Sequence, residues 1–176
     1  MLAEKYAERI EKIFAKYPDK RSAIMPLLYI AQEEYGYLSE EALKEVAALC
    51  DVDPTQAHSI AGFYTMFRES PKGTYWLQVC TDLPCALRGA DQFYKDLCDY
   101  LDVEDGGTTA DGIFTVEQVM CLAACDKAPM FQCNFHYYEN YDMEQMKVLI
   151  EQLRAEAASE SDTDTATETA SESGED

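Results

Sequence analysis

The sequence of 176 residues is long enough to bury a sizeable core, and its 47% hydrophobic and 11% aromatic content is that of a globular protein rather than a disordered one. Its 34 Asp and Glu residues against 14 Lys and Arg give a net charge of -20, which repels nucleic acid and anionic membranes unless a local basic patch intervenes. Because the sequence contains no such patch, we expect no nucleic-acid partner.

The hydrophobic segments are too short to span a membrane. The longest, "AIMPLLYIA" at residues 23–31, is interrupted by Pro26 and falls far below the roughly 20 residues that a bilayer requires. The first residues, "MLAEKYAERIEK", alternate in charge and do not resemble a secretory signal. We therefore expect a cytoplasmic protein without direct membrane insertion, in which the seven cysteines are reduced thiols or metal ligands rather than disulfides.

Residues 1–70 are predicted to form a helical bundle. Apolar residues recur at helical spacing over residues 2–17, and again in a stretch that ends at Gly36, a residue suited to a left-handed helix cap. Two further helices are expected to begin at Ser39 and Asp53, because Ser and Asp side chains accept hydrogen bonds from the first backbone N–H groups of a helix.

Residues 71–154 change to an alternation of strands and helices. The strand-like "TYWLQVC" is followed by a helical stretch, a Gly-rich turn, the β-rich "IFTVEQVMC", the alternating "PMFQCNFHYY" and the helical "MEQMKVLIEQLRAEA". We interpret "PMFQCNFHYY" as one half-buried strand. The order strand, helix, strand, strand, helix predicts a small α/β domain with one mixed sheet, for which a thioredoxin-like arrangement fits. The expected fold class of the chain is therefore α+β.

Residues 155–176 differ in composition from the rest. They contain eight acidic residues and eight Ser or Thr, with no basic, aromatic or large aliphatic residue. Such a segment cannot bury enough apolar surface to offset the entropy of ordering, so we predict a disordered acidic tail.

Two cysteine pairs are the candidate functional residues. Cys80 and Cys85 lie in "CTDLPC" and Cys121 and Cys125 lie in "CLAAC", and each pair directly follows an apolar, strand-like run. Two loops that leave neighbouring strands can converge at one edge of a sheet. Four thiolates from two such loops are suited to a metal centre, because sulfur is a soft ligand.

The spacing of the pairs leaves three kinds of site open. Zinc tolerates four cysteines at these intervals, and a 2Fe–2S cluster takes two thiolates per iron and suits the longer intervals. A thiol–disulfide oxidoreductase fits less well, because its cysteines are separated by two residues. We interpret Cys50, Cys98 and Cys133 as core residues, since each accompanies apolar residues on a helix or strand.

A family resemblance narrows this choice. The segments "CTDLPCALRGA" and "GTTADGIFTVEQVMCLAACDKAPM" resemble the thioredoxin-like 2Fe–2S subunit of NADH:quinone oxidoreductase, respiratory complex I. The segments "RSAIMPLLYIAQEEYGYLS" and "IAGFYTMF" are similar to the helical part of that family, so the resemblance covers roughly residues 1–150.

The resemblance implies an electron-transfer subunit with one 2Fe–2S cluster held by Cys80, Cys85, Cys121 and Cys125. It also implies a partner subunit that binds NADH and FMN and supplies the electrons, at the cytoplasmic side of the inner membrane. The chain itself would be a redox subunit without catalytic residues and without activity towards NADH.

Two features of the sequence leave alternatives to this interpretation: the residue at position 123 and the identity of the enzyme complex. The family commonly has glycine where this chain has Ala123, which matters if that position needs a positive φ. The same subunit type resembles parts of NAD-linked formate dehydrogenases and hydrogenases, and a zinc-stabilised structural module is a further alternative. The sequence does not separate these readings.

Overall fold

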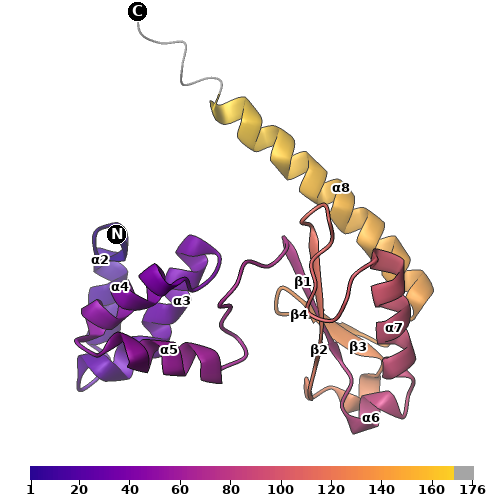
Figure 1. Cartoon of the computed structure of the whole chain (residues 1–176), viewed down its shortest axis with the longest axis horizontal. Coiled ribbons are helices and arrows are strands. Elements are labelled where there is room, and N and C mark those ends of the chain that lie inside the picture. Colours follow the sequence, from indigo (N-terminus) through magenta and orange to yellow (C-terminus); the bar gives the residue numbers. More distant parts are fainter. Residues whose placement is uncertain (169–176) are drawn as a thin grey trace, which may run out of the picture. The chain divides into compact units, whose positions relative to one another are not determined.

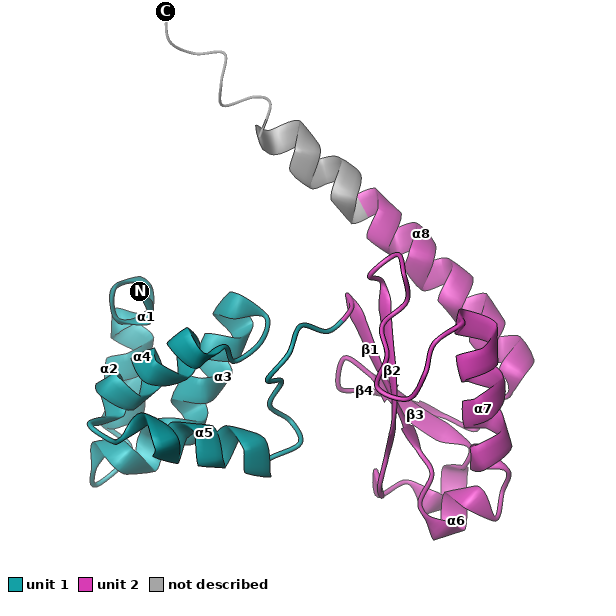
Figure 2. Ribbon diagram, viewed as in Figure 1, with its two compact units in different colours: residues 1–72 teal, residues 73–176 magenta. Residues whose placement is uncertain are grey.

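The chain divides into two compact units, Met1–Lys72 and Gly73–Asp176 (Figure 2). The computed structural model describes the backbone of residues 1–168 and the side chains of residues 1–159. No helix in this part of the chain is both long and apolar enough to cross a membrane. Helices together with a four-stranded mixed sheet confirm the predicted α+β class.

The first unit is entirely helical (Figure 1). Its elements are α1 (Leu2–Lys5), α2 (Ala7–Phe14), the 3-10 turn η1 (Lys20–Ala23), α3 (Ile24–Tyr35), α4 (Glu40–Cys50) and α5 (Pro54–Phe63). The single helix predicted over residues 2–17 is wrong, because Tyr6 leaves the helical conformation with φ -117° and separates α1 from α2. The Tyr6 hydroxyl instead donates a hydrogen bond to Glu34, 2.7 Å away on α3.

The predicted helix caps are confirmed. Ser39 Oγ accepts a hydrogen bond from the Ala42 N–H at 3.2 Å, and Asp53 Oδ1 accepts one from the Thr55 N–H at 2.8 Å. Gly36 ends α3 in the left-handed conformation, with φ +77°. These local signals fix where the helices begin and end, and apolar residues on their inner faces form the core. The fully buried members of this core include Leu27, Leu28, Val46, Ala47 and Ala57.

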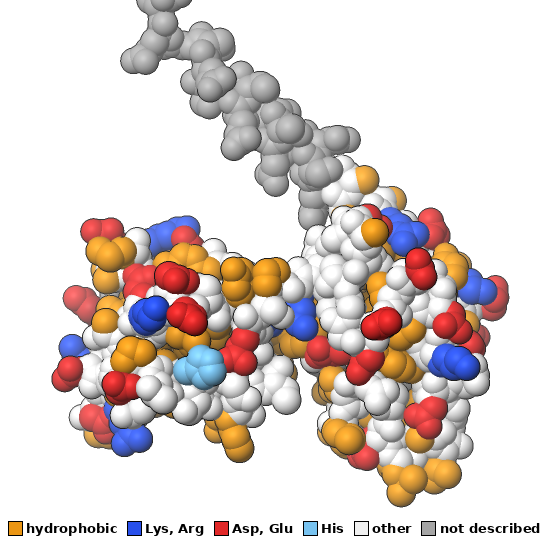
Figure 3. Space-filling view, in the orientation of Figure 1, with side chains coloured by type: hydrophobic (Ala, Val, Ile, Leu, Met, Phe, Trp, Pro, Cys, Tyr) orange, Lys and Arg blue, Asp and Glu red, His pale blue; other side chains and the backbone are white. Residues whose placement is uncertain are grey.

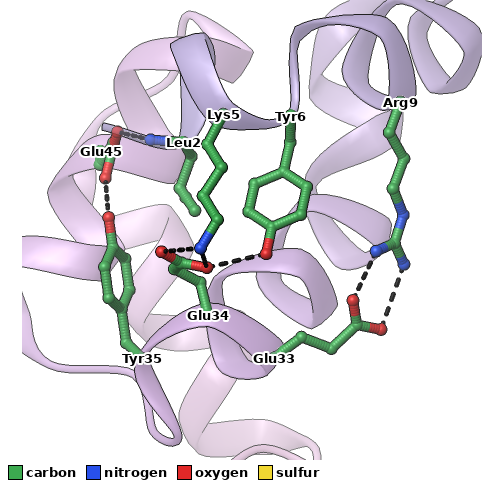
Figure 4. A network of polar contacts seen from close by, with 8 residues as sticks. All are labelled: Leu2, Lys5, Tyr6, Arg9, Glu33, Glu34, Tyr35 and Glu45. Carbon is green, nitrogen blue, oxygen red and sulfur yellow. Dashed lines mark hydrogen bonds and ion pairs between the residues drawn. The ribbon is translucent and has the colours of Figure 1, made fainter. Parts of the chain in front are cut away.

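A network of charged and phenolic side chains joins the first helices to α3 (Figure 4). Lys5 and Tyr6 both donate to the Glu34 carboxylate, and Arg9 pairs with Glu33 at 2.5 Å. The hydrogen bond from Lys5 is the largest cause of the lowered Glu34 pKa, followed by that from Tyr6. The Arg9 hydrogen bond lowers the Glu33 pKa in the same way.

These lowered carboxyl pKa values predict a loss of stability in acid. A carboxyl group with a pKa below its unfolded value of 4.5 stabilises the fold above that pH and loses this contribution as the pH falls through the folded pKa. We expect Glu34→Gln to lower the melting temperature at pH 7, and the difference from wild type to shrink towards zero below about pH 4. Thermal unfolding followed by circular dichroism between pH 3 and 7 measures this. If the difference in melting temperature between wild type and Glu34→Gln stays constant with pH, the lowered pKa of Glu34 is not the source of this stability.

The second unit is built on a sheet with the strand order β2-β1-β3-β4 (Figure 1). Its strands are β1 (Tyr75–Cys80), β2 (Phe114–Val119), β3 (Met130–Cys133) and β4 (His136–Glu139). Its helices are α6 (Leu83–Ala86), α7 (Ala90–Leu101), the 3-10 turn η2 (Cys125–Lys127) and α8 (Met143–Glu168). β1 runs parallel to β2 and antiparallel to β3, which is antiparallel to β4. The predicted mixed sheet is therefore confirmed.

Helices α7 and α8 cover one face of this sheet and enclose the core of the unit (Figure 1). Phe131 on β3 is fully buried there, and its ring lies 4.9 Å from that of Tyr138 and 6.3 Å from that of Phe93. Alternate residues of β1 and β2 also point into this core, because side chains of a strand face opposite sides in turn. They include Leu77, Val79, Phe114 and Val116.

Removing the Phe131 ring is expected to destabilise the second unit by about 3–5 kcal/mol. A phenylalanine truncated in a packed core loses its transfer free energy and leaves a cavity. Denaturant unfolding of Phe131→Ala measures the loss. Phe63→Ala is the matched control, because Phe63 is 78% exposed and its removal should change the free energy of unfolding by less than about 0.5 kcal/mol. Equal effects of the two changes would contradict this account of the core.

The segment "PMFQCNFHYY" is a hairpin, so its interpretation as one strand is wrong. Asn134 and Phe135 adopt positive φ angles of 45° and 71° and reverse the chain between β3 and β4. The Asn134 side chain holds this turn to β1, because its Oδ1 accepts from the Trp76 N–H at 2.9 Å and its Nδ2 donates to the Thr74 carbonyl at 2.9 Å. Alternation of apolar residues continues through the turn and conceals it.

Helix α8 extends further than the sequence predicts. Its backbone is helical to Glu168, whereas the composition predicts a disordered tail from residue 155. The segment from Ala155 contains Ala and Glu, which favour helix, and no Gly or Pro before Gly174, so it can continue a helix that the core has already nucleated. The rest of the predicted tail, residues 169–176, lies outside the described residues.

Candidate metal centre

The first cysteine pair lies where β1 gives way to α6. Cys80 is the last residue of β1 and is 1% exposed, and Cys85 lies within α6 and is fully buried. Asp82 starts the helix between them, because its Oδ1 accepts a hydrogen bond from the Leu83 N–H at 2.9 Å. Both cysteines therefore lie near the point where the strand gives way to the helix.

The second pair follows β2, the parallel neighbour of β1. Cys121 lies two residues beyond Val119, the last residue of β2, and Val119 is paired with Cys80 in the sheet. Cys125 begins the 3-10 turn η2, and its Sγ lies 3.8 Å from that of Cys121. Because parallel strands end at the same edge, the two loops meet there.

The four thiols are close enough to influence one another electrostatically. The pKa of Cys85 is raised to about 12, first by burial, then by a hydrogen bond with Cys80 and by the charges of the other three cysteines. The pKa of Cys125 is also raised, with the hydrogen bond to Cys121 as its largest cause. Four thiolates are therefore unfavourable here without a compensating cation, which a bound metal supplies.

Small apolar residues surround the buried pair. Cys80 and Cys85 share a cluster with Ala90, Ala128 and Met130 that is separate from the main core of the unit. Such a pocket excludes water from the sulfur atoms of these two residues. Exposure to solvent and the polarity of the surroundings set the reduction potential of an iron–sulfur centre.

Ala123 has the positive φ that glycine would favour. Its φ is +61°, and in this conformation its backbone N–H donates a hydrogen bond to Cys121 Sγ at 3.3 Å. Backbone N–H donors to cysteine sulfur are characteristic of iron–sulfur sites. Position 123 therefore does need the positive φ that glycine adopts freely, and alanine in this left-handed conformation costs about 1–2 kcal/mol.

The other three cysteines are core residues, as predicted. Cys50 is buried in the core of the first unit, Cys133 is buried in the core of the second unit, and the half-buried Cys98 packs against that second core. None of them belongs to the apolar cluster that holds Cys80 and Cys85.

The chemical groups around the four cysteines are those that an iron–sulfur cluster requires. They comprise two pairs of reduced thiols, one N–H donor to sulfur and a small-residue apolar pocket. We find no group of three or more His, Cys, Asp and Glu side chains arranged to hold a metal ion among the residues that the structure describes. The fit therefore depends on the two pairs and on the chemistry of their sulfur atoms.

A polar row across the sheet is not anticipated from the sequence. Gln78, two residues before Cys80 on β1, donates to Glu117 on β2 at 2.7 Å and accepts from Gln132 on β3. Gln78 and Gln132 are both buried, 3% and 6% exposed. The sequence pattern that could have predicted this row is a single glutamine in each of the apolar strands "YWLQVC" and "MFQC". A buried amide side chain needs a hydrogen-bond partner, so two such glutamines are expected to pair.

Exposed apolar residues beside the cysteines are also missed by the sequence reasoning. Leu83, Leu87 and Met120 are 69%, 80% and 78% exposed, and they lie in or next to the loops that carry the two pairs. Figure 3 shows hydrophobic side chains at the end of this unit where α6 lies. The sequence signal is a large apolar residue within two positions of a cysteine.

Fold and site together define a class: a thioredoxin-like domain with two cysteine pairs at one sheet edge, preceded by a helical unit. A family model described as thioredoxin-like [2Fe-2S] ferredoxin matches residues 10–154. The chain belongs to this family, and it is accordingly a 2Fe–2S electron-transfer protein.

Curated relatives give the particular kind of protein. The chain is 42% identical over 148 residues to a subunit of the NADH-quinone oxidoreductase of Rhizobium meliloti, which covers 84% of this chain and 88% of the relative. It is 40% identical over 149 residues to "NADH-quinone oxidoreductase subunit 2" of Thermus thermophilus, covering 83% of this chain and 82% of the relative. The chain is therefore a redox subunit of the oxidoreductase class.

A solved structure shares the fold. A chain of an NAD+-reducing [NiFe]-hydrogenase in the H2-reduced state superposes with a TM-score of 0.65 and 24% identity. The match covers 73% of this chain and 22% of the hydrogenase chain. At this level of identity the likeness shows the fold alone.

Proposed function

We propose that this chain is the electron-transfer subunit of an NADH:quinone oxidoreductase and that Cys80, Cys85, Cys121 and Cys125 hold its single 2Fe–2S cluster. The observation that carries the proposal is the position of both cysteine pairs at the same end of two parallel, neighbouring strands. The names of the curated relatives support the choice of enzyme, because identity to them reaches 42%.

The partner in this proposal is a subunit that binds NADH and FMN and passes electrons from the flavin to this chain. When bound, the cluster accepts and releases one electron at a time, so the chain needs no general acid, base or nucleophile. Its own residues contribute the sulfur ligands, an apolar pocket around Cys80 and Cys85, and the N–H of Ala123. We expect the chain alone to be inactive towards NADH.

We also propose that the chain works at the cytoplasmic side of the inner membrane as part of the complex. The support is that the relatives are named as subunits of a quinone-dependent oxidoreductase. We expect the chain to sediment with membranes when the other subunits are present, and to remain in the supernatant when it is produced alone.

The visible absorption spectrum of the anaerobically purified chain tests the proposed cofactor role. We expect broad sulfur-to-iron bands that bleach on addition of dithionite, together with two irons and two acid-labile sulfides per chain. A colourless protein with one tightly bound zinc would overturn the electron-transfer role and leave a structural metal module. Iron that is present but does not respond to dithionite would also contradict the proposal.

A further inference from the structure

The sheet of the second unit has one covered edge and one open edge. The loop before β2 covers the outer edge of that strand: the Val116 N–H donates to the Gly107 carbonyl at 3.0 Å, and the Val116 carbonyl accepts from the Gly106 N–H at 2.8 Å. Further along the same edge, Asp105 Oδ1 accepts from the Gln118 N–H at 3.1 Å. In the described part of the chain, β4 lies at the other end of the strand order and pairs with β3 alone.

One hydrogen bond shows which way the main-chain groups of β3 face. The Asn134 N–H, directly after β3, donates to the Trp76 carbonyl on β1 at 3.2 Å. Main-chain groups of an antiparallel strand face its two neighbours alternately. Gln132 therefore also faces β1, whereas Phe131 and Cys133 face β4.

The main-chain groups of Tyr137 and Glu139 consequently face outwards. The residues of β3 that face β4 are paired with Tyr138 and His136, so the hairpin uses the main-chain groups of these two. The N–H and C=O groups of Tyr137 and Glu139 point away from β3. An edge of this kind is a template on which another strand pairs.

Pairing of β4 with β4 of a second copy satisfies these outward groups in one register. When two copies run antiparallel about a two-fold axis beside Tyr138, Tyr137 lies opposite Glu139 of the second copy, and such a pair exchanges both main-chain hydrogen bonds. The outward groups of both residues are then bonded. An axis beside Tyr137 would place Glu139 opposite Phe135, which belongs to the turn, and an axis beside Glu139 would bring two carboxylates together.

The side chains along β4 suit the same register. Residues directly opposite each other lie on one face of a sheet, so the Tyr137 hydroxyl meets the Glu139 carboxylate of the second copy and the two Tyr138 rings meet each other. Lys127 Nζ lies 2.7 Å from the Glu139 carboxylate and offsets its charge. Tyr137 and Phe135 are 52% and 42% exposed, so they supply aromatic surface beside the paired strands.

We propose that the free chain forms a two-fold symmetric dimer in which β4 pairs antiparallel with β4 of a second copy, with Tyr137 of one copy opposite Glu139 of the other. The dimer covers the edge of the sheet that is otherwise open to other chains. The net charge of -20 repels a second copy, so the dimer is weak at low salt and strengthens as salt screens the repulsion. The inference is independent of the proposed cluster, because β4 carries none of the four cysteines.

Analytical ultracentrifugation of the full chain measures the association. Over about 1 μM to 1 mM, the range expected of a small interface, we expect a reversible equilibrium between monomer and dimer. At a given concentration, the dimer fraction should rise when the salt is raised to about 1 M, where the Debye length falls to about 3 Å. A chain that stays monomeric over this range at both low and high salt would overturn the proposal.

Hydrogen exchange of single amides, followed by NMR, locates the interface without any substitution. The Tyr138 N–H is bonded within the hairpin and should be protected at every concentration. The N–H groups of Tyr137 and Glu139 should exchange freely in dilute chain and slow by at least about tenfold as the dimer forms. A dimer in which both amides stay unprotected would overturn the proposal. Protection that appears only when the flavin-binding partner is added would also overturn it, and would assign this edge to that partner.

Two substitutions at position 137 separate main-chain pairing from side-chain contacts. Tyr137→Pro removes the outward N–H, which an edge strand tolerates, and should raise the dissociation constant of the dimer at least about tenfold. Tyr137→Val keeps this N–H and favours strand, so it is the matched control and should stay within about threefold of wild type. Equal dissociation constants for the two variants would overturn the proposal. Far-ultraviolet circular dichroism checks the fold of each variant, and if the proline variant does not fold, amide exchange of the wild-type chain decides.

Discussion

The substitution Cys121→Ala is expected to abolish stoichiometric cluster binding. The iron and acid-labile sulfide content per chain should fall at least about tenfold. Alanine cannot ligate iron, and the two-iron unit would be left with three of its four thiolates. Because the Cys121 side chain is exposed, its removal sacrifices little packing. A loss of cluster from this variant would therefore reflect loss of a ligand rather than loss of the fold.

The matched control for this prediction is Cys98→Ala. Cys98 is half-buried against the core of the second unit, so its removal costs at least as much packing as removal of Cys121. Its variant should nevertheless keep the full complement of iron and sulfide. Metal and sulfide analysis together with far-ultraviolet circular dichroism measures both properties. Full cluster content in Cys121→Ala, or equal losses in the two variants, would contradict the ligand assignment.

In the cluster-free chain, Cys121 should react with iodoacetamide at least about 100 times faster than Cys85 at pH 8. The thiolate is the reactive form, and burial, followed by the hydrogen bond with Cys80 and the charges of the neighbouring cysteines, raises the pKa of Cys85 from 9.0 to about 12. This shift lowers the thiolate fraction of Cys85 at pH 8 by about 1,000-fold, and burial adds a steric barrier. A raised thiol pKa means that reactivity appears only at higher pH, so the Cys85 rate should rise about tenfold per pH unit below 12.

Peptide mapping by mass spectrometry after brief alkylation at pH 7, 8 and 9 measures these rates. Cys50 and Cys133, whose pKa values burial raises to about 11, should also react slowly. Denatured chain is the control, because unfolding exposes all the cysteines to water and should bring their rates together. Equal rates for Cys85 and Cys121 in the folded chain would show that the first pair is not buried as the structure has it.

The asymmetry of the site has a direct consequence for function. The thiols of Cys80 and Cys85 are shielded by a small apolar cluster, while Cys121 is exposed next to Met120. In the function proposed above, the second cysteine loop is therefore the more accessible side of the site for a partner. The same exposure makes this loop the part of the site most open to oxidants and chelators.

Local sequence signals determined much of the fold. Ser39, Asp53 and Gly36 marked helix ends correctly, because a cap is a contact between a residue and its immediate neighbours. The four cysteines could be paired as candidates because each pair follows a recognisable apolar strand. The predictions that were wrong concern features that depend on residues distant in the sequence. One is the break between α1 and α2 at Tyr6, whose hydroxyl donates a hydrogen bond to Glu34 on another helix.

The sequence by itself determined the class of the protein and the order of a helical unit and a mixed α/β unit, and it put forward four of the seven cysteines as the proposed ligands. Only the tertiary structure decided how those four differ: parallel pairing of β1 with β2 brings the loops to one edge, and packing then buries Cys80 and Cys85 while leaving Cys121 exposed. It also decided that Ala123 directs its N–H at sulfur. Burial and hydrogen-bond direction arise from residues far apart in the chain, so no local spacing of cysteines could encode them.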